Sequence, residues 1–240
     1  MVWQEVIADM NVWVHEYSVP GYSQVNAFAV LMDEYNLAIV SPPTQMSETD
    51  FAAIDEKGRV TALIAPHSGH YLGQAEWQTR YPKAQSYAPS AALMQLNTLG
   101  LRPFIPLSEL FSTSEVEFRE VPGTKKGGTL VIVNRSRRPI VYLDELVCNF
   151  TSLPTAFLAR ILFWLMGSAP GLKINRVYLK YLCTDVQLLV QTVMDALNHD
   201  PAIVLAHGKP LVNSGDGIVV QNWWNLFNPS FQKTILKINA

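Results

Sequence analysis

Two histidines at the end of an apolar run are the residues whose types and spacing best fit metal chemistry. His67 and His70 stand three positions apart in the run Pro-His-Ser-Gly-His, directly after the apolar residues 60–65. Neutral imidazole is the commonest transition-metal ligand, and a turn at the end of a buried strand holds its side chains rigidly. The alternative is a structural turn, in which one histidine caps a helix starting near Leu72 and the other packs against its neighbours.

Two later segments end in the same way. The apolar run 202–206 leads into His207 and Gly208, and the run 139–143 leads into Asp144. A lone histidine after a strand is often a hydrogen-bonded structural residue, and a strand-end aspartate often caps a turn or the next helix. Gly208 favours a sharp turn that would aim His207 into a cleft, because glycine adopts positive φ without strain. Three strand ends that each carry a potential ligand indicate one metal site at an edge of a sheet.

The elements that must position these side chains follow from the hydrophobic pattern. We expect strands over 10–17, 25–32, 37–40, 60–65, 85–88, 115–121, 129–134, 139–143 and 202–206. We expect helices over 49–56, 72–80, 89–99, 153–166, 185–198 and 217–227. A β-rich first half followed by helix, helix, strand and helix predicts an α/β protein with two mixed sheets packed face to face and helices outside.

The composition predicts one domain over residues 1–240 and argues against several functions. Hydrophobic residues make up 49% of the chain and charged residues 16%, which indicates a thick core. The net charge of −2 offers no basic field for a nucleic acid. The glycine-rich run 123–128 lacks the Gly-Lys-Ser/Thr ending of a P-loop, and no serine stands in a nucleophile elbow.

The cysteine content and the first residues predict a cytoplasmic protein. Cys148 and Cys183 both have apolar neighbours, which is typical of buried free thiols and not of a disulfide framework. The N-terminus has no basic start followed by an apolar stretch, so we expect no signal peptide. The most apolar segment, 157–166, is too short to span a bilayer and contains Arg160, so we expect a buried helix and no membrane partner.

Taken in chain order, the run 65–70, then Asp144, then His207 and Gly208 resemble the metallo-β-lactamase superfamily, over about residues 12–224. Further likeness comes from Glu-Trp, Tyr-Pro and Tyr-Ala-Pro within 76–89 and from the run 205–210, and it is to a branch whose first motif is eroded. The resemblance implies a four-layer αβ/βα sandwich and metal-dependent hydrolysis of a small-molecule substrate.

The superfamily motif His-x-His-x-Asp-His falls on residues 65–70. Ala65 then replaces the first histidine and Gly69 replaces the aspartate, whereas His67 and His70 match the two other histidines. The middle motif, Gly-His-Thr-Pro-Gly, falls on 123–127, where Thr124 takes the place of the ligand histidine. The resemblance therefore leaves the first of the two metal sites with His67 alone.

The second metal site keeps more of its ligands. Asp144 matches the bridging aspartate and His207 matches the last histidine, so this site retains three ligands together with His70. Three protein ligands with an open fourth position are usual for a catalytic zinc, so we expect one divalent ion, zinc first. Two histidines and one carboxylate also suit ferrous iron or manganese.

Two functions of different classes follow. The first is a mononuclear metal-dependent hydrolase of a small ester, thioester, lactone or phosphoester, with His67 as a fourth ligand or as a proton donor. The second is a degenerate, non-catalytic member that binds a small ligand or a protein partner, with no metal at all. The three retained ligands favour the first. The missing aspartate at Gly69 favours the second, because it normally orients the attacking water and no nearby carboxylate obviously replaces it.

Overall fold

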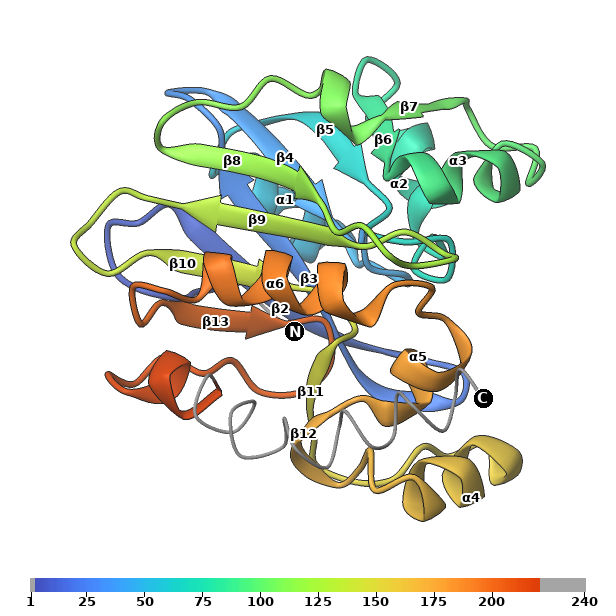
Figure 1. The fold of residues 1–240 in the computed structure, drawn as a ribbon. Coiled ribbons are helices and arrows are strands. Elements are labelled where there is room, and N and C mark those ends of the chain that lie inside the picture. The colour runs from blue at the N-terminus through green and yellow to red at the C-terminus, as the bar shows by residue number, and fades with distance from the viewer. Residues whose placement is uncertain (1–2, 221–240) are drawn as a thin grey trace.

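Two β-sheets dominate the computed structural model, which describes residues 3–220 (Figure 1). The larger sheet holds seven strands in chain order: β1 (Gln4–Glu5), β2 (Val12–Val19), β3 (Tyr22–Leu31), β4 (Asn36–Val40), β5 (Arg59–Ile64), β6 (Gln85–Ala88) and β7 (Phe104–Pro106). Its strands are antiparallel from β1 to β4 and parallel from β4 to β7.

The smaller sheet has the order β13-β10-β9-β8. Its strands are β8 (Val116–Glu120), β9 (Thr129–Val133), β10 (Ile140–Leu143) and β13 (Ala202–Leu205). β10 and β13 are parallel, whereas β9 is antiparallel to both of its neighbours. A separate antiparallel pair, β11 (Val147–Phe150) and β12 (Gly171–Ile174), follows β10. Both main sheets are therefore mixed, as expected.

Strand alternation sorts the apolar side chains into layers. On β9, Val131 and Val133 pack between the two sheets, and Leu130 and Ile132 pack toward the helices α5 (Arg176–Tyr181) and α6 (Val186–Ala196). On the outer face of the larger sheet lie α1 (Glu48–Asp55) and α2 (Gln74–Arg80), while α3 (Ser90–Leu96) packs against β7. The predicted sandwich of two sheets with helices outside is confirmed.

The expected strands and the longer helices are present, with ends shifted by a few residues. The elements that the pattern missed are short: β1, β7, the 3-10 turn Leu107–Glu109, β11, β12 and α5. Two to six residues are too few to show a period of either two or 3.6. The helix expected over 217–227 is helical over 216–220, and its remainder lies outside the described residues. The single domain over 1–240 stays a prediction for the same reason.

The expectation of a buried helix over 157–166 is wrong. α4 (Phe157–Leu165) buries Phe163 and leaves five other large apolar side chains exposed: Phe157, Leu158, Ile161, Trp164 and Leu165. The sequence shows that such a helix is apolar, but it does not show whether another element covers it. Within residues 3–220, no helix has the length and apolar character needed to cross a membrane.

Asn26 on β3 joins the larger sheet to the chain that follows β13. Its Nδ2 donates to the carbonyl oxygens of Leu205 at 2.7 Å and Gly208 at 2.6 Å. Its backbone N–H donates to the carbonyl oxygen of Ala206 at 2.9 Å. The side chain is fully buried, so water cannot replace these bonds.

We expect Asn26→Ala to lower the free energy of unfolding by about 1–3 kcal/mol, because it leaves two buried carbonyl oxygens without donors. Chemical denaturation measures this loss. Asn198→Ala is the matched control, since Asn198 is exposed in a turn and should change stability by less than about 0.5 kcal/mol. Equal losses of unfolding free energy from the two substitutions would show that the hydrogen bonds of Asn26 do not stabilise the protein.

Candidate metal centre

The turn that carries His67 and His70 follows β5 and is held from both sides. The N–H of His70 donates to the carbonyl oxygen of His67 at 3.1 Å, which closes the turn. The N–H of Ser68 donates to the carbonyl oxygen of Lys126 at 2.9 Å, and the hydroxyl of Thr129 donates to that of Pro66 at 3.0 Å. The turn therefore follows a strand of the larger sheet and is hydrogen-bonded to β9 of the smaller sheet and to the loop before it.

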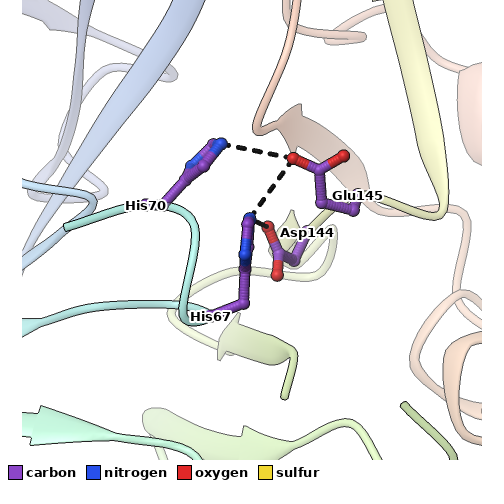
Figure 2. Close-up of side chains that lie close together, drawn as sticks. All are labelled: His67, His70, Asp144 and Glu145. Atoms are coloured by element: carbon purple, nitrogen blue, oxygen red, sulfur yellow. Dashed lines mark hydrogen bonds and ion pairs between the residues drawn. The ribbon is translucent and has the colours of Figure 1, made fainter. Parts of the chain in front are cut away.

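The other ligand candidates follow β10 and β13. Because these strands are parallel, their carboxyl ends reach the same edge of the sheet, and Asp144 and His207 lie there. Figure 2 shows the side chains of His67, His70, Asp144 and Glu145 pointing toward one another. One potential ligand atom from each of these four residues lies within 4.8 Å of the others, and among residues 3–220 no further group of this kind is found.

Glu145 lies at the middle of the cluster, and sequence reasoning missed it. Its Oε1 is 3.3 Å from Nε2 of His67, 3.2 Å from that of His70 and 2.9 Å from that of His207. The side chains of two adjacent residues in a strand point to opposite faces of the sheet. If the strand continued through these positions, the side chains of Asp144 and Glu145 would therefore point away from each other. The chain has left the strand here and turns, with the N–H of Leu146 donating to the carbonyl oxygen of Asp144 at 2.6 Å, so both carboxylates reach one site.

His207 is oriented by both of its ring nitrogens and by its ring face. Its Nδ1 donates to the carbonyl oxygen of Gln24 at 2.9 Å, which directs Nε2 at Glu145. The ring stacks on Phe150, with centroids 4.9 Å apart and an interplanar angle of 28°. A backbone carbonyl on the second ring nitrogen is the usual support of a histidine ligand.

Gly208 makes this position of His207 possible. It has φ +90°, and a Cβ atom there would lie 1.8 Å from the carbonyl oxygen of Asn149. The N–H of Asn149 donates to the carbonyl oxygen of His207 at 2.9 Å, so β11 runs directly against the turn. The sharp turn expected at Gly208 is present.

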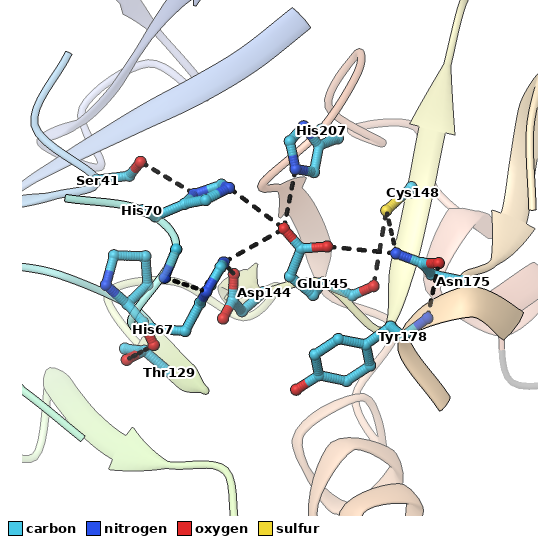
Figure 3. Close-up of polar contacts among 12 residues, drawn as sticks. Ser41, His67, His70, Thr129, Asp144, Glu145, Cys148, Asn175, Tyr178 and His207 are labelled. Carbon is cyan, nitrogen blue, oxygen red and sulfur yellow. Dashed lines mark hydrogen bonds and ion pairs between the residues drawn. The ribbon is translucent and has the colours of Figure 1, made fainter. Parts of the chain in front are cut away.

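The second ring nitrogen of His70, Nδ1, contacts a serine hydroxyl that is itself hydrogen-bonded to a tyrosine hydroxyl. This Nδ1 lies 3.2 Å from Oγ of Ser41 (Figure 3). Oγ of Ser41 in turn lies 2.9 Å from the hydroxyl of Tyr17. Burial lowers the pKa of His70 to about 4, and the nearby His67 adds to this shift. The imidazole is therefore neutral near pH 7, the state in which its Nε2 can bind a metal.

A backbone hydrogen bond fixes the tautomer of His67. The N–H of Gly69 donates to Nδ1 of His67 at 2.9 Å, so this nitrogen carries a lone pair. In the neutral ring the proton then sits on Nε2, where it donates to Oε1 of Glu145. A nitrogen that carries a proton cannot bind a metal at the same time, so this hydrogen bonding favours His67 as a donor over His67 as a ligand.

Asp144 and Glu145 share the site but differ in their surroundings. Asp144 is buried, and neither of its carboxylate oxygens makes a hydrogen bond within the described part of the chain, although its Oδ1 lies 3.9 Å from Nε2 of His67, within range of an ion pair when that ring is protonated. Burial raises the pKa of Asp144 to about 6, against the pull of His67, and the charge of Glu145 adds to the rise. Burial also acts to raise the pKa of Glu145, but the charge of His207 and hydrogen bonds from the three imidazoles hold it well below its usual value.

A buried carboxylate without donors fits a cation site. Burying a carboxylate costs several kcal/mol unless it is paired, neutralised or bound to a metal, and the 3.9 Å contact of Asp144 with His67 is too long for a hydrogen bond. A divalent ion between His70, Asp144 and Glu145 would supply the missing partner, and these nitrogen and oxygen donors suit zinc, ferrous iron or manganese.

Asn175 holds Glu145 from behind (Figure 3). Its Oδ1 accepts from the N–H of Tyr178 at 3.1 Å as the N-cap of α5, so its Nδ2 faces Oε2 of Glu145 at 3.3 Å. The same Nδ2 lies 3.9 Å from Sγ of Cys148. Cys148 is a buried free thiol, as expected, and Cys183 is a half-buried one.

The positions that lack the expected ligands have acquired other roles. Ala65 is fully buried in an apolar cluster with Ala88, Ala92, Leu96 and Phe104. A Cβ atom on Gly69 would lie 2.7 Å from Cε1 of His67, so the ring occupies the space of an aspartate side chain there. Thr124 is buried and forms a β-bridge with Cys183.

Solved structures that share this fold include two metallo-β-lactamases and a flavoprotein fragment. DIM-1 metallo-β-lactamase has a TM-score of 0.58 at 14% identity, covering 88% of this chain and 92% of its own. The structure of TMB-1 has a TM-score of 0.57 at 17% sequence identity, covering 92% of this chain and 98% of its own. The 1–254 fragment of a protein assigned as diflavin flavoprotein A 5, from Nostoc sp. PCC 7120, has a TM-score of 0.63 at 13% sequence identity. The match covers 97% of this chain and 98% of the fragment.

No protein-family model matches the sequence, and no curated protein matches it. The structural likeness nevertheless extends over most of the chain, and it confirms that the fold is that of the metallo-β-lactamases.

We expect Gly69→Ala to destabilise the protein by about 1–3 kcal/mol, because the new methyl group overlaps the ring of His67. A double-mutant cycle measured by chemical denaturation tests the cause. In a His67→Ala background the cost of Gly69→Ala should fall to a few tenths of a kcal/mol. If Gly69→Ala destabilised the His67→Ala variant as much as the unaltered protein, the strain would not arise between these two residues.

Proposed function

We propose that this chain is a mononuclear metal-dependent hydrolase that acts on a small ester, thioester, lactone or phosphoester. The observation that carries the proposal is the buried carboxylate of Asp144, which lacks a hydrogen-bond partner beside neutral His70 and the ionised Glu145. The fold, shared with metallo-β-lactamases, supports this class of chemistry.

His70, Asp144 and Glu145, three members of the group of four, would hold the ion. His207 would join them as a fourth ligand; it lies outside that group and meets it at Oε1 of Glu145, 2.9 Å from its Nε2. In His207 the ring nitrogen that is not needed for the metal already donates to a backbone carbonyl, and in His70 it meets a serine hydroxyl. We propose zinc, and iron and manganese suit the same donors. A divalent ion bound there supplies a water molecule whose pKa is lowered toward neutrality.

The remaining steps fall to side chains of the chain itself. Glu145 is a carboxylate acceptor at the centre of the site, and it would orient the attacking water in place of the aspartate that is absent at Gly69. The Nε2–H of His67 points at the same centre and would protonate the leaving group. Asn175 would keep Glu145 in position through its Oε2.

One observation favours the non-catalytic alternative. Oε1 of Glu145 faces the Nε2 atoms of all three imidazoles at 2.9–3.3 Å, so most of the cluster pairs its charges without an ion. Such a network could serve as a polar brace beneath a binding surface. Asp144 distinguishes the two functions. The network without an ion leaves its carboxylate with no hydrogen bond and with a single 3.9 Å contact to Nε2 of His67, whereas a metal site would coordinate it.

Metal content distinguishes the two functions. We expect about one divalent ion per chain in protein purified without a chelator or a metal-affinity column, measured by elemental mass spectrometry. Asp144→Asn should remove the ion, since it deletes a charged ligand from a buried site. Glu34→Gln, a change of the same kind on an exposed turn, should retain it. Two ions per chain would contradict the ligand assignment, and no ion in the unaltered protein would favour the brace.

The role of His67 can be separated from that of a ligand. We expect His67→Gln to retain the ion but to lower kcat by about 10²–10⁴-fold, because the variant lacks a group that can give up a proton. The rates are measured on a panel of nitrophenyl ester, thioester, lactone and phosphodiester substrates. Loss of the ion from His67→Gln would instead make His67 a ligand.

A further inference from the structure

The exposed face of α4 is the largest run of uncovered apolar side chains on one described element. Phe157 is 73% exposed, Leu158 80%, Trp164 65% and Leu165 67%. At about 100° per residue, these positions and Ile161 fall within an arc of about 120°, and the buried Phe163 lies nearly opposite. One side of the helix therefore holds it to the protein, and the other side presents a continuous apolar strip to its surroundings.

The part of the chain that contains α4 carries positive charge only. Residues 146–184 contain four cationic side chains and no aspartate or glutamate, although the whole chain carries −2. The four cations are Arg160, Lys173, Arg176 and Lys180. Arg160 is exposed on α4 itself, next to the strip, and a guanidinium nitrogen of Arg176 lies 3.9 Å from the position of a Cβ atom on Gly167, at the end of α4. In Figure 1, α4, β12 and α5 lie on the same side of the molecule.

We propose that α4 docks on an anionic lipid surface. A helix that lies in a bilayer interface presents Trp, Phe and Leu to the acyl boundary and cationic residues to the headgroups, and α4 with its neighbours has this arrangement. Nine residues of helix span about 14 Å, so α4 lies on a membrane and does not cross it. This docking does not depend on the proposed hydrolysis.

A second copy of the chain fits this face less well. A standard interface buries about 800 Å² on each partner, more than five side chains of one short helix provide. Two copies would also bring their cations together with no acidic residue between 146 and 184 to offset them.

The docking face is connected to the metal centre by two aromatic contacts. Phe163 lies edge-on to Phe150 at 5.7 Å, and Phe150 stacks on His207 at 4.9 Å. A protein docked through α4 would therefore hold the centre close to the lipid surface.

Vesicle co-sedimentation of the full chain tests the docking. We expect the protein to sediment with vesicles of phosphatidylcholine and phosphatidylglycerol, and much less with phosphatidylcholine alone. The double variant Leu158→Ser with Leu165→Ser should bind at least about tenfold more weakly, because it removes two inserted side chains. Lys173→Glu with Lys180→Glu should weaken binding by about fivefold or more per site, and added salt should act in the same direction.

Met94→Ser is the matched control, since Met94 is 86% exposed but lies on α3, and it should leave the binding unchanged. Circular dichroism confirms that each variant is folded. No binding to anionic vesicles by the unaltered protein, or equal binding by the serine double variant, would overturn the proposal. So would a dimer in light scattering that the double variant converts to monomer, or binding that appears only after residues 221–240 are deleted.

Discussion

The carboxylate of Glu145 is the group on which the arrangement at this edge of the molecule depends. It meets imidazoles from two different connections, the turn after β5 in the larger sheet and the chain after β13 in the smaller one. Between the sheets themselves the contacts are apolar, and apolar contacts specify a separation better than a direction. The short contacts of Glu145 at the edge add directional hydrogen bonds between the two connections, which the apolar core does not provide.

The positions at which the resemblance would place further ligands are occupied in other ways. Ala65 and Gly69 do not leave two empty ligand positions, because apolar packing has taken over one and the ring of His67 the other. The second carboxylate of the cluster comes from Glu145, the residue after Asp144. Both acidic groups of the cluster are therefore supplied by the connection that follows β10.

The sequence was informative where a strand was long enough to show its period. His67, His70, Asp144 and His207 stand at the ends of clear apolar runs, so their approach to one edge could be foreseen. Glu145 could not, because alternation assigns neighbours to opposite faces and only the turn at Leu146 reverses this. The exposure of α4 was hidden for a different reason: hydrophobicity measures what a side chain prefers, whereas burial depends on a partner elsewhere in the fold.

The bonds from Asn26 also bear on how the chain folds. They reach carbonyl groups 179 and 182 positions further along, across nearly the whole length of the described chain. Contacts of this separation are slow to form, because a long loop must close before they contribute. During synthesis, β3 must wait for almost every later element before its last polar partners emerge from the ribosome. The contacts of Asn26 at the edge that gathers the histidines therefore cannot form until residue 208 has been made.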